Sequence, residues 1–131
     1  MSQENVELHR RMLDAFNRRD WDAFVAHADK EIVVESRLVA VEGGWRGHEG
    51  LRGWWDNFLG VFPDYTGELL EVRDLGDVTL GRVRGFGHGA ASDAPMVDRF
   101  WQPIRWRDGK CLWWRNCPTE ADALQAAGLA E

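Results

Sequence analysis

The feature that most constrains the fold is a pair of strand-like runs between Met96 and Cys117, joined by the sequence RDGK at residues 107–110. Aromatic and β-branched residues favour extended backbone, and Asp-Gly between two such runs is the strongest short signal for a hairpin turn. The stretch therefore predicts two antiparallel strands, around which the rest of the chain has to be organised.

Alternate residues of a strand face the same side of its sheet. One face of the first run is mostly apolar but carries an acid and an amide: Asp98, Phe100, Gln102, Ile104 and Trp106. In the second run the residues that share a face are Leu112, Trp114 and Asn116. Aromatic residues interrupted by Asp98, Gln102 and Asn116 predict the floor of a pocket, where a few polar groups orient an apolar ligand. Pro103 leaves an alternative open, because a bulge at this residue would exchange the two faces.

The remainder of the chain indicates helices first and strands later. Apolar periodicity predicts helices over residues 3–19, 21–28 and 48–61, and a short last helix over residues 119–128. Strands are expected over residues 32–41, 67–74 and 78–87, with a glycine-rich loop at residues 42–47. This order predicts one α+β domain over residues 1–131, in which helices cover one side of a strongly bent antiparallel sheet.

Charge and hydropathy exclude several classes of partner. The net charge of −6 is spread along the chain, whereas a nucleic-acid partner requires a basic patch. The apolar runs are far shorter than the roughly 20 residues of a membrane span, and the first residues do not form the apolar core of a signal peptide. We therefore expect a cytoplasmic protein with no nucleic-acid or membrane partner.

The two cysteines do not predict a disulfide or a metal site. Cys111 and Cys117 lie on one expected strand, which places them roughly 20 Å apart, whereas a disulfide needs Cα atoms within about 7 Å. No Cys or His spacing is typical of zinc. We expect reduced cysteines and no metal or cofactor.

Four segments in this order resemble the nuclear-transport-factor-two-like superfamily, in its SnoaL-like branch: AFNRRDWDAFVAHADKEIVVES, WRGHEGLRGWWDNF, RWRDGKCLWWRN and ADALQAAGL. The resemblance covers nearly the whole chain. It implies a conical, strongly curved antiparallel or mixed sheet covered by three helices, a cystatin-like α+β barrel with an apolar pocket inside. It also implies a homodimer through the outer sheet face, where we expect Trp101 and Trp113. Members of the superfamily include isomerases, cyclases, dehydratases, epoxide hydrolases and proteins without catalysis.

The ketosteroid isomerases of this superfamily have catalytic residues that the chain matches poorly. Their base is an acid near the end of the first strand, where this chain has Glu35 and Ser36. Met12 lies in the region of their oxyanion-binding tyrosine, and their second acid falls near Trp101 and Gln102. Because the donors to a developing enolate are missing at these positions, the resemblance does not favour this chemistry.

The catalytic residues of the epoxide hydrolases are absent from this chain, whereas those of the cyclases have one possible match. The hydrolase pattern of Arg-x-Asp and a late Asp aligns with Arg82 to Arg84 and with Asn116, so both acids are absent. The cyclases use an acid on the late strands, and Asp98 is the acid on the face expected to point inward. Burial among aromatic residues would raise the pKa of Asp98 and make it a usable acid or base. An ion pair between Asp98 and Arg82 or Arg84 is the alternative.

Two hypotheses of function follow. The first is a cofactor-free enzyme, a cyclase, isomerase or dehydratase, that acts by acid–base catalysis on a small apolar or polycyclic molecule. Its expected catalytic residues are Asp98, Asn116 and Arg84. The residues expected to line the pocket are Glu35, Trp54, Trp55, Phe58, Arg82, Phe100, Gln102 and Trp114. The second hypothesis is a non-catalytic module that binds a hydrophobic molecule in the same pocket.

Overall fold

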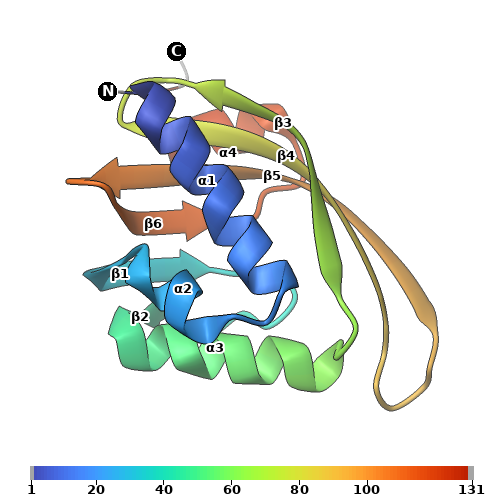
Figure 1. Ribbon diagram of the computed structural model, residues 1–131. Coiled ribbons are helices and arrows are strands. Elements are labelled where there is room, and N and C mark those ends of the chain that lie inside the picture. The colour runs from blue at the N-terminus through green and yellow to red at the C-terminus, as the bar shows by residue number, and fades with distance from the viewer. Residues whose placement is uncertain (1, 130–131) are drawn as a thin grey trace.

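The computed structural model describes residues 2–129, which form four helices and one six-stranded sheet (Figure 1). The helices are α1 (Ser2–Asn17), α2 (Trp21–Ala26), α3 (Gly47–Val61) and α4 (Glu120–Ala126). The strands are β1 (Ala28–Glu35), β2 (Trp45–Arg46), β3 (Thr66–Asp74), β4 (Val78–His88), β5 (Pro95–Arg107) and β6 (Lys110–Arg115). The expected order of helices followed by a late group of four strands is confirmed.

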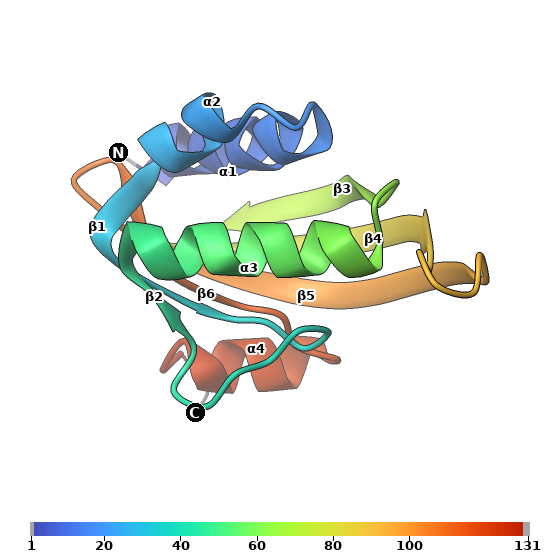
Figure 2. The ribbon, with the colours of Figure 1, turned by 90° about the horizontal axis from the view of Figure 1, so that it is seen from below.

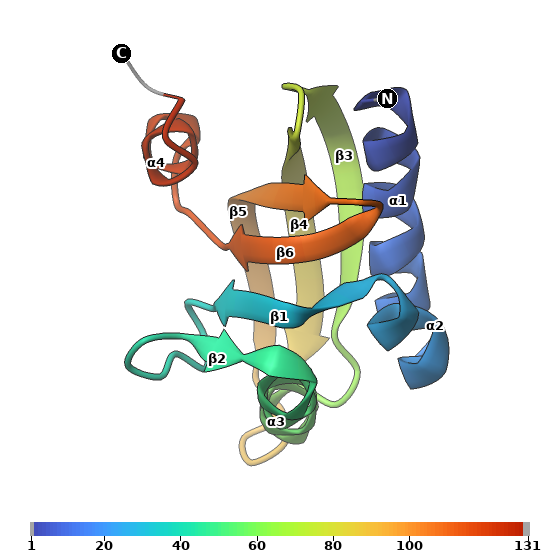
Figure 3. The ribbon, with the colours of Figure 1, turned by 90° about the vertical axis from the view of Figure 1, so that its left-hand side faces the viewer.

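The sheet has the strand order β2-β1-β6-β5-β4-β3, with β1 and β6 parallel and all other neighbours antiparallel. It curls strongly, so that α1, α2 and α3 lie on its concave side and α4 lies on the convex side (Figures 2 and 3). The mixed, curved sheet and the α+β class agree with the expectation from sequence. The fourth helix packs against the outer face, where Ala123 contacts Leu80 and Cys117.

The central hairpin forms as the Asp-Gly sequence predicts. Asp108 and Gly109 both have positive φ, 53° and 76°, the conformation of the tight turns whose twist matches that of paired strands. Register between β4 and β5 is unbroken through Pro103, and the irregularity between β5 and β6 falls at Arg105 and Trp106 instead. The inward face of β5 is therefore the one expected without a bulge at proline.

The first strand differs from the sequence prediction. It runs over Ala28–Glu35 rather than residues 32–41, and residues 42–47 include the short strand β2, which pairs with Val33 and Val34. The chain after Glu35 leaves the sheet in a loop that Trp45 closes by donating its indole N–H to the Val39 carbonyl, at 2.8 Å. The β-branched residues of this segment therefore lie partly in β1 and partly in the loop. In the loop, the hydrogen bond of the Trp45 indole outweighs their preference for strand backbone.

The core is an aromatic cluster between the helices and the concave face of the sheet. The ring of Phe16 on α1 lies 5.6 Å from that of Trp54 and 5.4 Å from that of Trp55, both on α3. Phe24 on α2 and Phe58 on α3 complete this layer. Each such side chain contributes about 1.5–3 kcal/mol when it is fully buried, so the cluster fixes the helices over the sheet.

No helix of residues 2–129 is long and apolar enough to cross a membrane.

Candidate functional site

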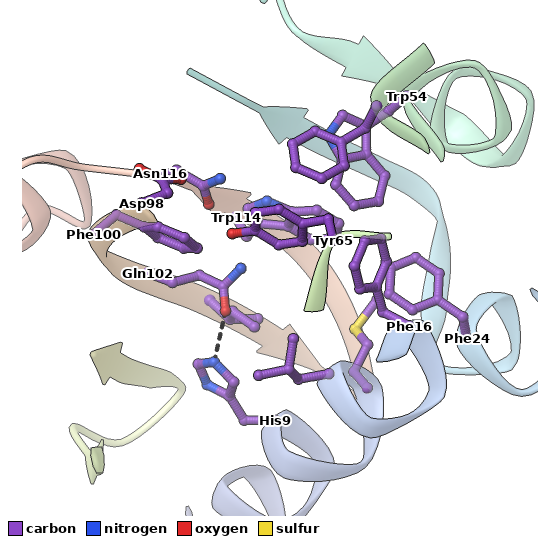
Figure 4. Close-up of a pocket in the computed structure, with 14 residues that line it drawn as sticks. His9, Phe16, Phe24, Trp54, Tyr65, Asp98, Phe100, Gln102, Trp114 and Asn116 are labelled. Carbon is purple, nitrogen blue, oxygen red and sulfur yellow. Dashed lines mark hydrogen bonds between the residues drawn. The ribbon is translucent and has the colours of Figure 1, made fainter. Parts of the chain in front are cut away.

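A cavity of about 50 Å³ lies between the helices and the concave sheet face (Figure 4). Its walls are mostly apolar, from Met12, Leu13, Phe16, Phe24, Trp54, Phe58, Phe100, Ile104 and Trp114. The polar residues that line it are His9, Tyr65, Asp98, Gln102 and Asn116. This volume holds a few water-sized groups, and it is smaller than the 300–1,000 Å³ typical of small-molecule sites.

Strand alternation brings several of the expected site residues together. Asp98, Phe100 and Gln102 line the cavity from β5, as does Trp114 from β6. Asn116 follows β6 and lines the cavity too, and Trp54 and Phe58 reach it from α3.

Asp98 forms an ion pair with Arg37, which belongs to the loop after β1. Their Oδ1 and Nη2 atoms are 2.6 Å apart, and the Asp98 side chain is only 8% exposed. The alternative of a pair with Arg82 or Arg84 is wrong. Burial raises the pKa of Asp98 above the usual value of an aspartate, and this effect outweighs the opposing influence of the Arg37 charge.

Tyr65 supplies a neutral hydroxyl at the same cavity. The residue is 5% exposed, and its ring packs at 4.7 Å from that of Phe58. Burial raises the pKa of its phenol, and the charge of Asp98 raises it further. Because the phenol keeps its proton, Tyr65 can donate a hydrogen bond into the cavity.

His9 lies at the deep end of the cavity in a buried polar network. Its Nδ1 is 2.8 Å from the Thr79 hydroxyl and its Nε2 is 2.9 Å from Gln102 Oε1. Trp106 donates its indole N–H to the same hydroxyl at 2.8 Å. Burial lowers the pKa of His9 to about 4, so the imidazole is neutral at pH 7.

Three further polar atoms at the cavity have no hydrogen-bond partner among the described residues. They are the indole nitrogens of Trp54 and Trp114 and the Oδ1 atom of Asn116, all buried. Buried polar groups are nearly always paired in folded proteins, so each of these atoms has unused hydrogen-bonding capacity that faces the site.

Four expected site residues lie outside the cavity. Gly85 is the residue opposite Asp98, so Arg82 and Arg84 point to the outer face, where their partners are Glu71 and Glu68.

The other two are Glu35 and Trp55. Glu35 faces the side of β1 opposite to its buried neighbour Val34, and its carboxylate accepts the Trp113 indole N–H at 2.6 Å. Trp55 is buried behind the wall, against Trp21 and Phe24.

Two surface grooves adjoin the ion pair of Arg37. The first has a volume of about 430 Å³ and lies beside α4, and the second, of about 350 Å³, lies under the loop after β1. Arg37 and Asn116 border both grooves, and Asn116 also lines the cavity. Arg37 therefore lies between the buried cavity and much larger open spaces.

Sequence reasoning missed His9, Arg37 and Tyr65 as site residues. His9 falls on the apolar stripe of α1, where a histidine is itself a signal of a buried polar contact. Gly81 is a second signal, because a Cβ atom there would lie 2.8 Å from His9 Nε2. Arg37 gives no such signal, since its loop was expected to be a strand.

Among residues 2–129 no three His, Cys, Asp or Glu side chains are arranged to hold a metal ion.

These observations define a class of protein: an α+β cone whose curved sheet and helices enclose an aromatic cavity with a buried acid. The chain belongs to the family of the SnoaL-like domain, whose model matches residues 9–114. Among curated proteins no match was found.

Solved structures with the same fold include three from bacteria. IdmH, a candidate polyketide cyclase from Streptomyces antibioticus, is 19% identical, with a TM-score of 0.73 over 93% of this chain and 96% of that one. A protein with a ketosteroid isomerase-like fold from Catenulispora acidiphila, in complex with trimethylamine, is 14% identical, with a TM-score of 0.77 over 94% and 93%. A cystatin-fold protein from Novosphingobium aromaticivorans is 19% identical, with a TM-score of 0.73 over 86% and 96%. These likenesses show the fold.

Proposed function

We propose that the chain binds a small, largely apolar molecule in the aromatic cavity and catalyses a cofactor-free proton transfer on it through Asp98. The observation that carries this proposal is the buried Asp98 carboxyl, whose pKa is raised by burial at the edge of an aromatic cavity. A carboxylate with a raised pKa is a stronger base, which favours a role in proton transfer.

The cavity supports distinct roles for its polar groups. Asp98 takes a proton from a carbon atom next to a ligand carbonyl and returns it at another position. Tyr65, Gln102 and Asn116 provide hydrogen bonds to the oxygen on which negative charge develops. Trp54, Phe58, Phe100 and Trp114 form the apolar walls. Removal of this proton is the step shared with cyclases and dehydratases, whereas its return at another position is isomerisation, and IdmH, of the same fold, is a candidate polyketide cyclase.

A ligand larger than a few atoms needs Arg37 to move. The cavity measures about 50 Å³, whereas the groove beside α4 measures about 430 Å³. The Arg37 side chain is 39% exposed, so water can replace Asp98 as its partner, and the cost of the movement falls on the buried Asp98 carboxylate, which loses its cation. Its departure would join the cavity to the groove and expose the carboxylate to the ligand.

A non-catalytic binding module is the second candidate function. The observation that favours it is the ion pair itself, because Arg37 already occupies the Asp98 carboxylate as its partner. In that case the ligand would fill the aromatic space, and Asp98 would serve to hold the loop after β1.

Proton exchange distinguishes the two functions. Cyclohexanone in D₂O exchanges the hydrogens beside its carbonyl through an enolate, and NMR measures both this exchange and binding. We expect wild type to accelerate exchange and Asp98→Asn to bind cyclohexanone but lose about a hundredfold or more of the acceleration. The matched control is Asp77→Asn, at a surface carboxylate paired with Arg105, which should behave as wild type. Binding without acceleration by the wild type would contradict catalysis and leave the binding module.

We also propose a homodimer formed through the outer sheet face. Phe86 on β4 and Val97 on β5 are direct cross-strand neighbours there, 40% and 53% exposed. Paired exposed apolar residues of this kind favour a protein interface. Light scattering should give a dimer for wild type and a monomer for Val97→Glu, and a monomeric wild type would contradict the proposal.

Both cysteines are free and buried, which supports a reducing compartment such as the cytoplasm.

A further inference from the structure

The network at the deep end of the cavity forms a chain of four side chains that ends at the ligand space. It begins at Trp106 on β5, passes through Thr79 on β4 and His9 on α1, and ends at Gln102 on β5. Gly81 makes the chain possible, since any side chain at this position would collide with His9. Figure 4 shows the last link, in which the Gln102 amide oxygen is directed at His9 and the amide nitrogen points away from it.

Hydrogen-bond chemistry fixes the direction of this chain. An amide oxygen only accepts, so His9 Nε2, at 2.9 Å from Gln102 Oε1, carries the ring proton and donates it. Neutral His9 has a single ring proton, so its Nδ1 accepts from the Thr79 hydroxyl, whose oxygen in turn accepts the Trp106 indole N–H. The Gln102 amide is therefore held with its NH₂ group toward the cavity.

Two other unused groups of the same cavity are donors as well, whereas Asn116 Oδ1 is an unused acceptor. The indole N–H groups of Trp54 and Trp114 are buried and have no acceptor among residues 2–129, although both residues line the cavity. Gln102 Oε1 is bonded to His9, which leaves the Nε2 end of the amide as a third donor of this wall. Three N–H donors thus belong to residues that line the cavity, and the two buried indole groups among them require an acceptor.

We propose that the cavity recognises a hydrogen-bond acceptor oxygen that carries no proton, as in a ketone, a quinone or an enolate, through the N–H groups of Gln102, Trp54 and Trp114. His9 and Thr79 are positioning residues, which hold the Gln102 amide in its donating orientation. This inference rests on the proposed ligand cavity and adds the donors that recognise the ligand oxygen and the residues that orient them. Asn116 differs from Gln102 because no described residue fixes which end of its amide faces the cavity.

Three probes of nearly equal size test the polarity: cyclohexanone, methylenecyclohexane and cyclohexylamine. They present at the same position an acceptor oxygen, an apolar group and a charged donor. A site with buried donors discriminates strongly against a ligand that leaves them unpaired. We expect NMR titration to give cyclohexanone an affinity at least tenfold above that of either analogue, with shifts of the Gln102 side-chain amide and of the Trp54 and Trp114 indole signals.

Two variants test the residues. Gln102→Met keeps the length of the side chain without its donor, and it should reduce the preference for cyclohexanone over methylenecyclohexane by about tenfold, which is the effect of one hydrogen bond. Thr79→Val removes the hydroxyl that bonds His9 Nδ1, so the imidazole proton should no longer be confined to Nε2, and the imidazole ¹⁵N shifts report this change. The same variant should weaken the preference for cyclohexanone. The matched controls are Gln3→Met and Thr66→Val, at exposed positions, which should retain the full preference.

The outcomes separate this inference from the proposed function. Equal binding of cyclohexanone and methylenecyclohexane, tightest binding of cyclohexylamine, or a preference unchanged in Gln102→Met would each overturn the inference and leave the ligand cavity in place. If Gln102→Met does not fold, the wild-type amide and indole shifts and the Thr79→Val variant decide. Absence of binding by all three probes would contradict the proposed function, and with it this inference.

Discussion

Gly85 lies directly opposite Asp98 in the ladder between β4 and β5, and the Tyr65 hydroxyl occupies the space where a side chain of residue 85 would begin. A Cβ atom on Gly85 would overlap the Tyr65 oxygen. Glycine at this register position therefore allows the tyrosine and the aspartate to share one end of the cavity. Because adjacent residues of a strand face opposite sides, the neighbouring Arg84 lies on the outer face.

Gly85→Ala should displace Tyr65. We expect a loss of about 1–3 kcal/mol in the free energy of unfolding, because an inserted methyl group in a packed interior forces its neighbours to move. Urea denaturation measures this loss. Gly60→Ala is the matched control, since residue 60 is exposed on α3 with no atom within 4 Å of the new Cβ, and it should stabilise the helix by about 0.5–1 kcal/mol. Similar effects of the two substitutions would contradict the close packing of Tyr65 on Gly85.

His9 should make stability depend on pH. Its pKa is about 4 in the folded chain and 6.5 in the unfolded chain, so the unfolded state binds more protons between these values. The free energy of unfolding should therefore fall by about 3 kcal/mol as the pH drops from 7 to below 4, and His9→Gln should lack this contribution. Urea denaturation across this range measures it.

His88 provides a control of opposite sign for this dependence. It is exposed, and its hydrogen bond with Asp64 raises its pKa, so its small contribution is present at low pH and is lost as the pH rises. His88→Gln should leave the loss of stability at acid pH in place. If His88→Gln, and not His9→Gln, removed it, the buried neutral state of His9 would be contradicted.

Asp98 should give a stability profile of the opposite direction to that of His9. Its folded pKa is raised above 3.8, so the native state binds more protons than the unfolded state between these two values. The free energy of unfolding of wild type should therefore fall, relative to Asp98→Asn, as the pH rises from 3.8 through the folded pKa, and the difference should then level off. Parallel profiles of the two proteins would contradict the raised pKa.

The strands of the site could be predicted from sequence because alternation and the hairpin turn are local signals. Asp98, Phe100 and Gln102 were assigned to one face of β5, and the structure has them together on the cavity wall. The turn at Asp108 and Gly109 sets the first pairs of β5 with β6, as far as Trp106, beyond which the irregularity at Arg105 shifts the register.

The partners across the cavity could not be predicted, because they depend on contacts between distant segments. His9 and Gln102 are separated by 93 residues, and Arg37 and Asp98 by 61. Arg37 was placed on a strand, whereas the loop closed by Trp45 delivers it to the carboxylate. The arginines on β4 seemed suitable partners by proximity in the sheet, but alternation turns them away from Asp98.

Arg37 is the cation that opposes the effect of burial on Asp98, so its removal has a directional consequence. Arg37→Gln should raise the pKa of Asp98 further, because desolvation then acts without the neighbouring positive charge. Titration of the Asp98 carboxyl ¹³C signal measures this shift. The matched control is Arg99→Gln, which removes an exposed arginine from the next position of β5, on the outer face, and should shift this pKa far less. Equal shifts in the two variants would mean that the overall charge of the protein, and not the contact with Arg37, sets the protonation of Asp98.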